Sequence, residues 1–198
     1  MKQILMLLSR LLKASREAVK PDSTKWDTII SQILREHLGA MQLRSPELAQ
    51  ELERDMTTEC ENLTAYLTAL PKTGVVAPES EDKILSVGEK LSAQFVAVFL
   101  KDRGVDSEYV DLSDVINFKV AHGLNQAFYH DLARVIGRRI QLCGDRVPII
   151  TGFFGPVPGG LLETCGRGYS DLCAALAAVG LGAKELQVWK EVSGVYTA

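Results

Sequence analysis

A glycine-rich stretch between an apolar run and a helix start is the feature that most constrains the fold. The apolar run 147–151 predicts a buried strand, and glycines follow it at positions 152, 155, 159, 160, 166 and 168. A helix is then expected to begin at Ser170 and Asp171. Glycine lets a backbone approach a ligand closely, and a helix N-terminus offers free N–H groups to an anion. The succession therefore predicts an anion-binding loop at the carboxyl end of a strand, where open α/β sheets bind ligands.

Two interpretations of this stretch remain open from the residues alone. In the first, Arg167 stands between two glycines as a guanidinium fork for a carboxylate or phosphate. In the second, the glycines form a surface loop, Ser170 caps the next helix, and Asp171 is a favourable acid in its first turn. The pattern is neither a Walker loop nor a Rossmann fingerprint, so general motifs do not decide between them.

The rest of the second half alternates between strands and helices. Strands are expected at 109–112 and 186–189, and a helix with a basic face is expected at 126–140. The order of strand, helix, strand, loop, helix and strand predicts an α/β fold with helices on the faces of a sheet.

The first half is predicted to be helical. Helices are expected at 24–38, 46–70 and 82–103, and Ser45 followed by Pro46 and Glu47 is a strong helix start. At the N-terminus Leu5, Leu8, Leu11 and Leu12 share one helical stripe, which favours a core helix over a transit peptide.

Composition excludes several functional classes. The 198 residues suffice for one sizeable domain, and a net charge of -3 argues against broad electrostatic binding to nucleic acid. No apolar run approaches the ~20 residues that would span a membrane. The four cysteines and three histidines lack metal-ligand spacing, so we expect free thiols in a reducing compartment and no metal site.

Several motifs resemble those of aspartate kinases, and the fungal enzymes are the most similar. Residues 166–175 read G-R-G-Y-S-D-L-C-A-A, and residues 189–198 read W-K-E-V-S-G-V-Y-T-A. Residues 86–92 read S-V-G-E-K-L-S, and residues 151–158 read T-G-F-F-G-P-V-P. The resemblance covers 84–198 strongly, while residues 1–80 look like a helical insertion typical of fungal members. It implies a partial amino-acid kinase domain over 1–198, with the aspartate and ATP sites in 81–198.

The resemblance implies the fold, the reaction and its setting. The fold would be a three-layer α/β/α sandwich similar to that of carbamate kinase. The reaction would transfer the γ-phosphoryl group of ATP, bound with Mg²⁺, to the side-chain carboxylate of L-aspartate. Its product, 4-phospho-L-aspartate, begins threonine and methionine biosynthesis. A cytoplasmic enzyme that forms a homo-oligomer in its full-length state is expected.

The resemblance also implies a role for each site residue. Glu89 would bind the α-amino group of aspartate and Arg167 its carboxylate. Gly168 and Ser170 would line the phosphate path, and Asp171 would organise the phosphate-neutralising lysine and position the γ-phosphoryl group. Three residues, namely Lys190, Glu191 and Tyr196, match the nucleotide-side loop of the family.

Two departures from the family pattern qualify this expectation. The sequence contains no K-F-G-G-T-S segment, whose lysine contacts the transferring phosphate, and it stops at Ala198, where relatives continue with D-P-R and regulatory ACT domains. We therefore expect a fragment with reduced or no kinase activity on its own. A non-catalytic binding module of the same fold, or a kinase for another carboxylate substrate, are the alternatives.

Overall fold

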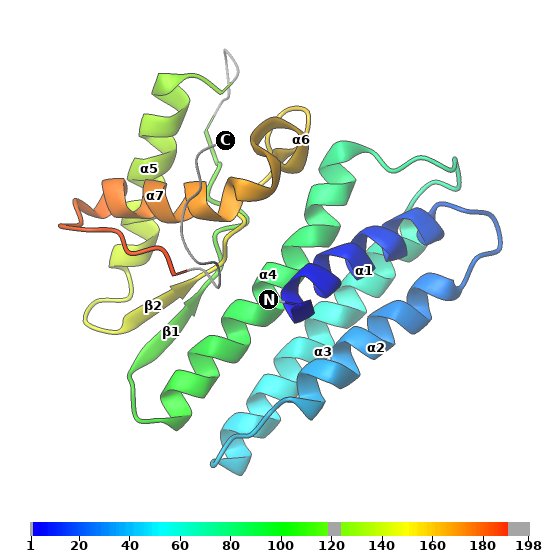
Figure 1. The fold of residues 1–198 in the computed structure, drawn as a ribbon, viewed down its shortest axis with the longest axis horizontal. Helices are drawn as coiled ribbons and strands as arrows, with labels where there is room; N and C mark the ends of the chain where they lie inside the picture. The colour runs from blue at the N-terminus through cyan, green and yellow to red at the C-terminus, as the bar shows by residue number, and fades with distance from the viewer. Residues whose placement is uncertain (1, 119–123, 190–198) are drawn as a thin grey trace.

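The computed structural model describes residues 2–118 and 124–189, which form two hydrophobic cores joined by one long helix (Figure 1). The first core is formed by α1 (Lys2–Ala18), α2 (Lys25–Gly39), α3 (Pro46–Ala69) and one side of α4 (Pro78–Asp102). The second surrounds β1 (Ser107–Val110), α5 (Gln126–Gln141), β2 (Val147–Ile150) and α7 (Tyr169–Leu181). The short helices α6 (Leu161–Cys165) and η1 (Gly166–Gly168) connect β2 to α7.

The predicted helical first half is confirmed. In α1 the buried stripe consists of Leu7, Leu11, Ala14 and Ala18, at a spacing of three or four residues. The predicted stripe is therefore correct only in part, because Leu11 is buried whereas Leu8 and Leu12 are only partly buried. A Cβ atom at Gly88 of α4 would lie 3.0 Å from Leu11 Cδ1, so this glycine lets the two helices pack closely. The indole of Trp26 is buried in the same core, and its N–H donates to the carbonyl of Ser23.

The start of α3 shows why local sequence predicts a helix well. Ser45 precedes the helix with extended backbone angles, and its hydroxyl accepts a hydrogen bond of 3.2 Å from the N–H of Leu48. Pro46 occupies the first helical position, where a missing N–H costs nothing. The predicted boundaries of α3 are therefore nearly correct, whereas α4 begins at Pro78 rather than at Asp82.

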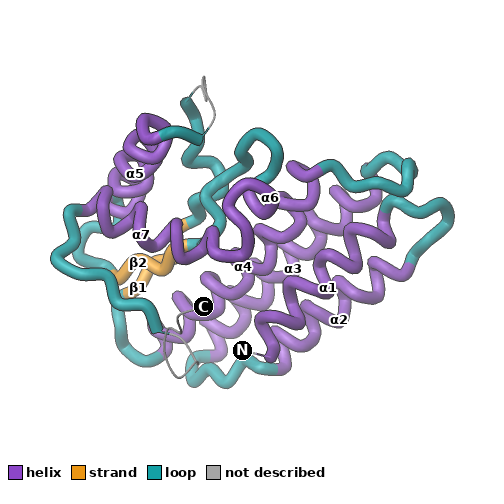
Figure 2. Tube along the Cα trace, turned by 45° about the horizontal axis from the view of Figure 1, so that its top comes forward, coloured by secondary structure: helices purple, strands orange, loops and turns teal. Residues whose placement is uncertain are grey.

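The two strands confirm the α/β class. They pair in parallel, with Ser107 opposite Val147 and Val110 opposite Ile150, and α5 lies in the connection between them. Helix α4 lies on one side of this pair, while α5 and α7 lie on the other (Figures 1 and 2). The Ser107 hydroxyl donates to the carbonyl of Ala97 in α4, whereas Val110 belongs to the second core. These two residues, an odd number of positions apart in β1, thus face opposite sides of the strand pair.

Three predictions in the second half are wrong or incomplete. The segment 186–189 is not a strand, because it pairs with neither β1 nor β2, and Trp189 is 88% exposed. Apolar and aromatic residues favour a strand only where a neighbouring strand can pair with them and one face can pack against other residues. The strand 147–150 is less buried than expected, since Val147 is 44% exposed. The stretch 152–168 is not loop throughout, because it contains α6 and η1.

Helices α5 and α7 cross at two glycines. A Cβ atom at Gly137 would lie 2.4 Å from the carbonyl oxygen of Gly180, and a Cβ atom at Gly180 would lie 1.9 Å from that of Ala133. Both distances are far below van der Waals contact, so this crossing requires glycine at both positions. Among the helices of the described ranges, none is long and apolar enough to cross a membrane.

Candidate functional site

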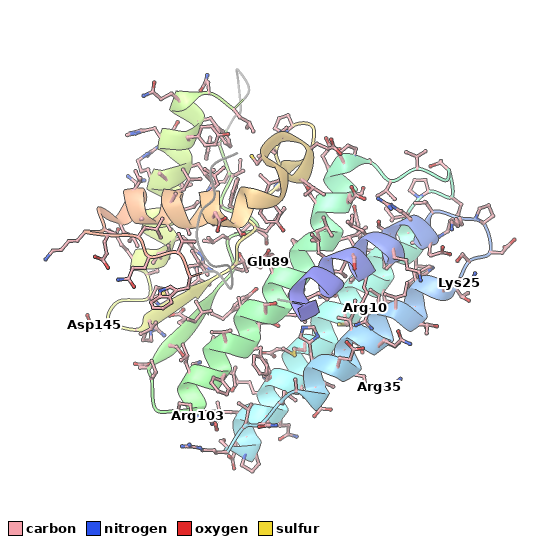
Figure 3. All side chains as sticks on the ribbon, viewed as in Figure 1. Arg10, Lys25, Arg35, Glu89, Arg103 and Asp145 are labelled. Carbon is pink, nitrogen blue, oxygen red and sulfur yellow. The ribbon has the colours of Figure 1, made fainter. Side chains whose placement is uncertain are left out.

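Three segments that are distant in sequence converge at the carboxyl end of β2. Glu89 lies in the middle of α4, Gly152 follows β2, and Ser170 is the second residue of α7. A Cβ atom at Gly152 would lie 2.7 Å from Glu89 Oε2 and 2.8 Å from Ser170 Cβ. Figure 3 shows Glu89 on the side of α4 that faces this meeting point. The structure therefore brings together two of the predicted site residues, with a glycine between them.

The end of the sheet is held by a threonine hydroxyl. Thr151 is buried, and its hydroxyl accepts a hydrogen bond of 3.0 Å from the N–H of Leu112 and donates one of 2.9 Å to the carbonyl of Phe153. The chain after β1 is thereby tied to the chain after β2. This arrangement places Gly152 at a fixed position beside Glu89.

The Glu89 carboxylate has neutral partners in the described structure. The Tyr169 hydroxyl donates to Oε1 at 3.2 Å, and the backbone N–H of Gly152 is also hydrogen-bonded to the carboxylate. Burial raises the pKa of Glu89, and these two hydrogen bonds oppose the shift without cancelling it. No cationic side chain of the described part is among the groups that act on this carboxyl. A ligand with a positive charge would therefore be stabilised here.

The start of α7 lies where the sequence predicts an anion site, and that role stays a prediction. Gly168 is the N-cap residue and makes no side-chain hydrogen bond to the helix. Ser170 is half-buried at the site, whereas Asp171 is exposed in the first turn. The N–H of Tyr169 is hydrogen-bonded to the carbonyl of Gly166, because η1 runs directly into α7.

A second carboxylate of α4 anchors the loop that leads to α7. Asp82 is buried and accepts hydrogen bonds from the backbone N–H groups of Leu161 and Leu162, the latter at 3.1 Å. Burial raises the pKa of Asp82, and the two N–H groups oppose the shift. Helix α4 thus caps α6 through Asp82 and contacts α7 through Glu89.

Lys90, the neighbour of Glu89 in sequence, belongs to a separate charge network. Its ammonium group lies 2.8 Å from Asp111 Oδ2 and 4.0 Å from Glu59 Oε1. Burial by itself would raise the pKa of Asp111, but hydrogen bonds from Lys90 and Ser113 outweigh burial and hold it below its usual value. Burial raises the pKa of Glu59. The network connects α3 to the end of β1.

A cleft of about 440 Å³ lies beside this network. Its walls come from α3, α4 and the segments that follow the two strands. They include Tyr66, Lys83, Ser86, Lys90, Ser113 and Phe153. Lys90 and Phe153 are the chain neighbours of Glu89 and Gly152, so the cleft lies next to the converging segments.

Several predicted site residues cannot be placed against this geometry. The side chain of Arg167 and the residues Lys190, Glu191 and Tyr196 lie outside the described part of the chain. Their roles stay predictions. Within the described ranges, no three acid, histidine or cysteine side chains are arranged to hold a metal ion.

Sequence reasoning missed Tyr169 and Asp82 as contributors to the site. Tyr169 stands inside the G-R-G-Y-S-D motif, and a tyrosine at a helix start beside glycines is a signal, because a buried phenol needs a hydrogen-bond partner. Asp82 gave no such signal, since an acid near a helix start is ordinary. Only the folded chain shows that it caps a different helix.

Comparisons with known proteins identify the family of this chain. Residues 24–198 match the amino acid kinase family, and the chain therefore belongs to this family. It is 40% identical over 193 residues to an aspartokinase of Schizosaccharomyces pombe, a match that covers 96% of this chain and 37% of the relative. It is 42% identical over 200 residues to an aspartokinase of Candida albicans, which covers 96% of this chain and 36% of that protein.

A bacterial relative is more distant. The chain is 29% identical over 158 residues to lysine-sensitive aspartokinase 3 of Escherichia coli, with 78% of this chain and 34% of the relative covered. The predicted resemblance to aspartate kinases is thus confirmed. The chain spans little more than a third of the length of these curated relatives.

Proposed function

We propose that this chain contributes the amino-acid subsite of an aspartate kinase, which transfers the γ-phosphoryl group of ATP to the side-chain carboxylate of L-aspartate. The observation that carries the proposal is the convergence of Glu89, Gly152 and the start of α7. It places a carboxylate without a described cationic partner beside the N-terminus of a helix. An amino acid has the complementary charges, with an ammonium group for the carboxylate and a carboxylate near the helix end.

Each residue then has a chemical task. Glu89 binds the α-ammonium group, Gly152 lets the Glu89 carboxylate approach the chain after β2 closely, and Arg167 pairs with a carboxylate of the substrate. The backbone at Gly168 and the hydroxyl of Ser170 line the path of the phosphoryl group. Direct transfer needs no covalent enzyme intermediate, so catalysis comes from holding two anions in line and neutralising the developing charge.

The nucleotide end of the site is completed by residues on and after α7. Asp171 organises the phosphate end, and Lys190, Glu191 and Tyr196 contact the nucleotide. Mg²⁺ bound to ATP would supply charge neutralisation at the phosphates.

The proposal extends to the whole protein of which this fold is a part. The parallel pair β1 and β2, with helices on both sides, would be two strands of a three-layer α/β/α sandwich. The exposed apolar side chains of Val188 and Trp189 would pack against further parts of that sandwich. The full protein would form 4-phospho-L-aspartate for threonine and methionine biosynthesis in the cytoplasm, as a homo-oligomer.

Ligand-dependent unfolding tests the substrate assignment without requiring turnover. A ligand at ~100 times its dissociation constant raises the free energy of unfolding by about 2.7 kcal/mol. We expect L-aspartate to move the midpoint of urea unfolding accordingly. Succinate, which lacks the ammonium group, and L-glutamate, which is one methylene longer, should move it much less.

The alternatives predict different results from the same titration. Equal shifts with succinate and aspartate would contradict the role of Glu89, and a larger shift with glutamate would indicate another amino-acid kinase. A midpoint unmoved by any of the three would contradict the proposed subsite. Glu89→Gln should abolish the aspartate shift, whereas the matched control Glu53→Gln, at an exposed position of α3, should retain it.

A further inference from the structure

Tyr169 connects two parts of the site. It is the first residue of α7, is 5% exposed, and has its ring in the second hydrophobic core. Its hydroxyl leaves that core and donates to Glu89 Oε1, a contact between residues 80 positions apart in sequence. A phenol held by a packed ring is a rigid donor, because only two side-chain torsions set the position of the hydroxyl.

The Glu89 side chain needs such a donor. Three torsions separate its carboxylate from the backbone of α4, so the carboxylate has several accessible orientations. The N–H of Gly152 reaches it from one element and the hydroxyl of Tyr169 from another. Two donors from different elements fix the plane of the carboxylate, whereas either one alone leaves it free to rotate.

The electrostatic surroundings keep Tyr169 in the donor state. Burial is the largest cause that raises the pKa of its phenol, and the nearby charges of Glu89 and Asp82 raise it further. Cys173 of α7 also lies near Glu89, and burial, with the Glu89 charge, raises the pKa of its thiol to about 12. Both groups are therefore neutral at physiological pH, and Tyr169 retains its proton.

We propose that Tyr169 is a positioning residue, whose hydroxyl orients the Glu89 carboxylate for the ammonium group of the substrate and ties the amino-acid subsite to the first turn of α7. The inference rests on the proposed function, since it assigns Glu89 to ammonium binding. Tyr169 acts through Glu89 and does not itself touch the reacting atoms. Ser170 and Asp171 follow it directly in the chain, so the orientation of Glu89 is coupled to the phosphate end of the site.

The test is Tyr169→Phe, which removes the hydroxyl and keeps the ring in the core. The dissociation constant for L-aspartate should rise about tenfold, as expected for the loss of a hydrogen bond to a charged group. Because the hydroxyl lowers the pKa of Glu89, its loss should raise that pKa. The fall in aspartate binding on acidification should therefore begin at a higher pH than in the wild type.

Calorimetric titrations across a pH series measure both effects, with Tyr129→Phe as the matched control. Tyr129 lies on α5, outside the segments that converge at Glu89, and this variant should bind aspartate as the wild type does. Succinate serves as a second probe. A general structural defect would weaken the binding of succinate and of aspartate equally, whereas the loss of a positioning residue should weaken the binding of aspartate selectively. Wild-type affinity and an unshifted pH profile in Tyr169→Phe would overturn the inference.

A carbon-13 NMR titration of the Glu89 carboxyl separates this inference from the proposed function. If the wild type binds no aspartate, the proposed function fails, yet a raised Glu89 pKa in Tyr169→Phe still supports the contact, and an unchanged value overturns it. If Tyr169→Phe does not fold, the phenol resonance of Tyr169 in the wild-type protein decides. Its chemical shift should change with pH as Glu89 titrates, and this change should be absent in Glu89→Gln. A chemical shift with the same pH dependence in both proteins would overturn the inference.

Discussion

At the scale of single residues, the site contains a carboxylate that costs the folded chain stability. Burial raises the pKa of Glu89, so the folded state favours its protonated form more than the unfolded state does. The stability that protonated Glu89 contributes is fully present below its unfolded pKa. It is lost as the pH rises through the higher folded pKa. At neutral pH the ionised group therefore opposes folding, which is a common property of binding sites.

The raised pKa of Glu89 leads to a prediction for Glu89→Gln. Glutamine is neutral at every pH and retains one acceptor for Gly152, while the Tyr169 hydroxyl can rotate to accept from its amide. The free energy of unfolding of the variant relative to the wild type should be higher near pH 7 than near pH 4. Urea unfolding at the two pH values measures the difference. Glu53→Gln should show no such pH dependence, and equal differences for Glu89→Gln at both pH values would contradict the assigned pKa shift.

At the scale of secondary-structure elements, the crossing of α5 and α7 determines where the site helix lies. The backbones approach so closely at Gly137 and Gly180 that a methyl group on either would overlap a carbonyl oxygen. Backbone atoms cannot rotate aside as a flexible side chain does, so one of the helices would have to shift. Since α7 carries Tyr169 and Ser170, such a shift would move them relative to Glu89.

Gly180→Ala should therefore destabilise the fold and weaken the site together. The free energy of unfolding should fall by about 3 kcal/mol, at the upper end of the range for overpacked interiors. Urea unfolding and aspartate titration measure the two effects. Gly39→Ala, where a Cβ atom meets nothing within 4 Å, should leave aspartate binding unchanged and should not lower the free energy of unfolding. A Gly180→Ala variant with wild-type stability would show that the helices do not cross as closely as described.

Elements whose determinants are local could be predicted from the sequence, and those that depend on distant partners could not. Ser45 and Pro46 specify the start of α3 within four residues, and that start is confirmed. The segment 186–189 has the composition of a strand, but a strand also requires a neighbour, which local composition does not supply. For the same reason the motifs indicated Glu89 and Ser170 separately, while the contact of Glu89 with Tyr169 appears only in the fold.

At the scale of the whole molecule, Lys90 joins the two cores electrostatically. Its bond to Asp111 connects α4 to the end of β1, and Glu59 extends the network to α3. The pKa of Asp111 is lowered, so its contribution to stability is present above its unfolded pKa and is lost as the pH falls through its folded pKa. The helical part and the α/β part are thus held together by a half-buried charge network.

Lys90→Met should lower the free energy of unfolding and remove this pH dependence. The variant leaves Asp111 and Glu59 without their shared cation, and the partial exposure of the pair limits the loss to about 1–3 kcal/mol. The free energy of unfolding should also decline less steeply with acidification than it does in the wild type. Lys83→Met, whose ammonium lies over the Tyr66 ring, is the control and should keep the wild-type decline. An unchanged stability for Lys90→Met would contradict the coupling.

The two tryptophans differ in exposure, so their fluorescence distinguishes two parts of the molecule. Trp26 is 9% exposed within the helical core, whereas Trp189 is 88% exposed after α7. A buried indole emits at shorter wavelength than one in water, and a dissolved quencher such as iodide reaches only the exposed one. The fluorescence that iodide does not quench therefore reports on the helical core, and the quenchable emission reports on the chain that follows the site helix. The wild-type protein thus contains one intrinsic probe for each part.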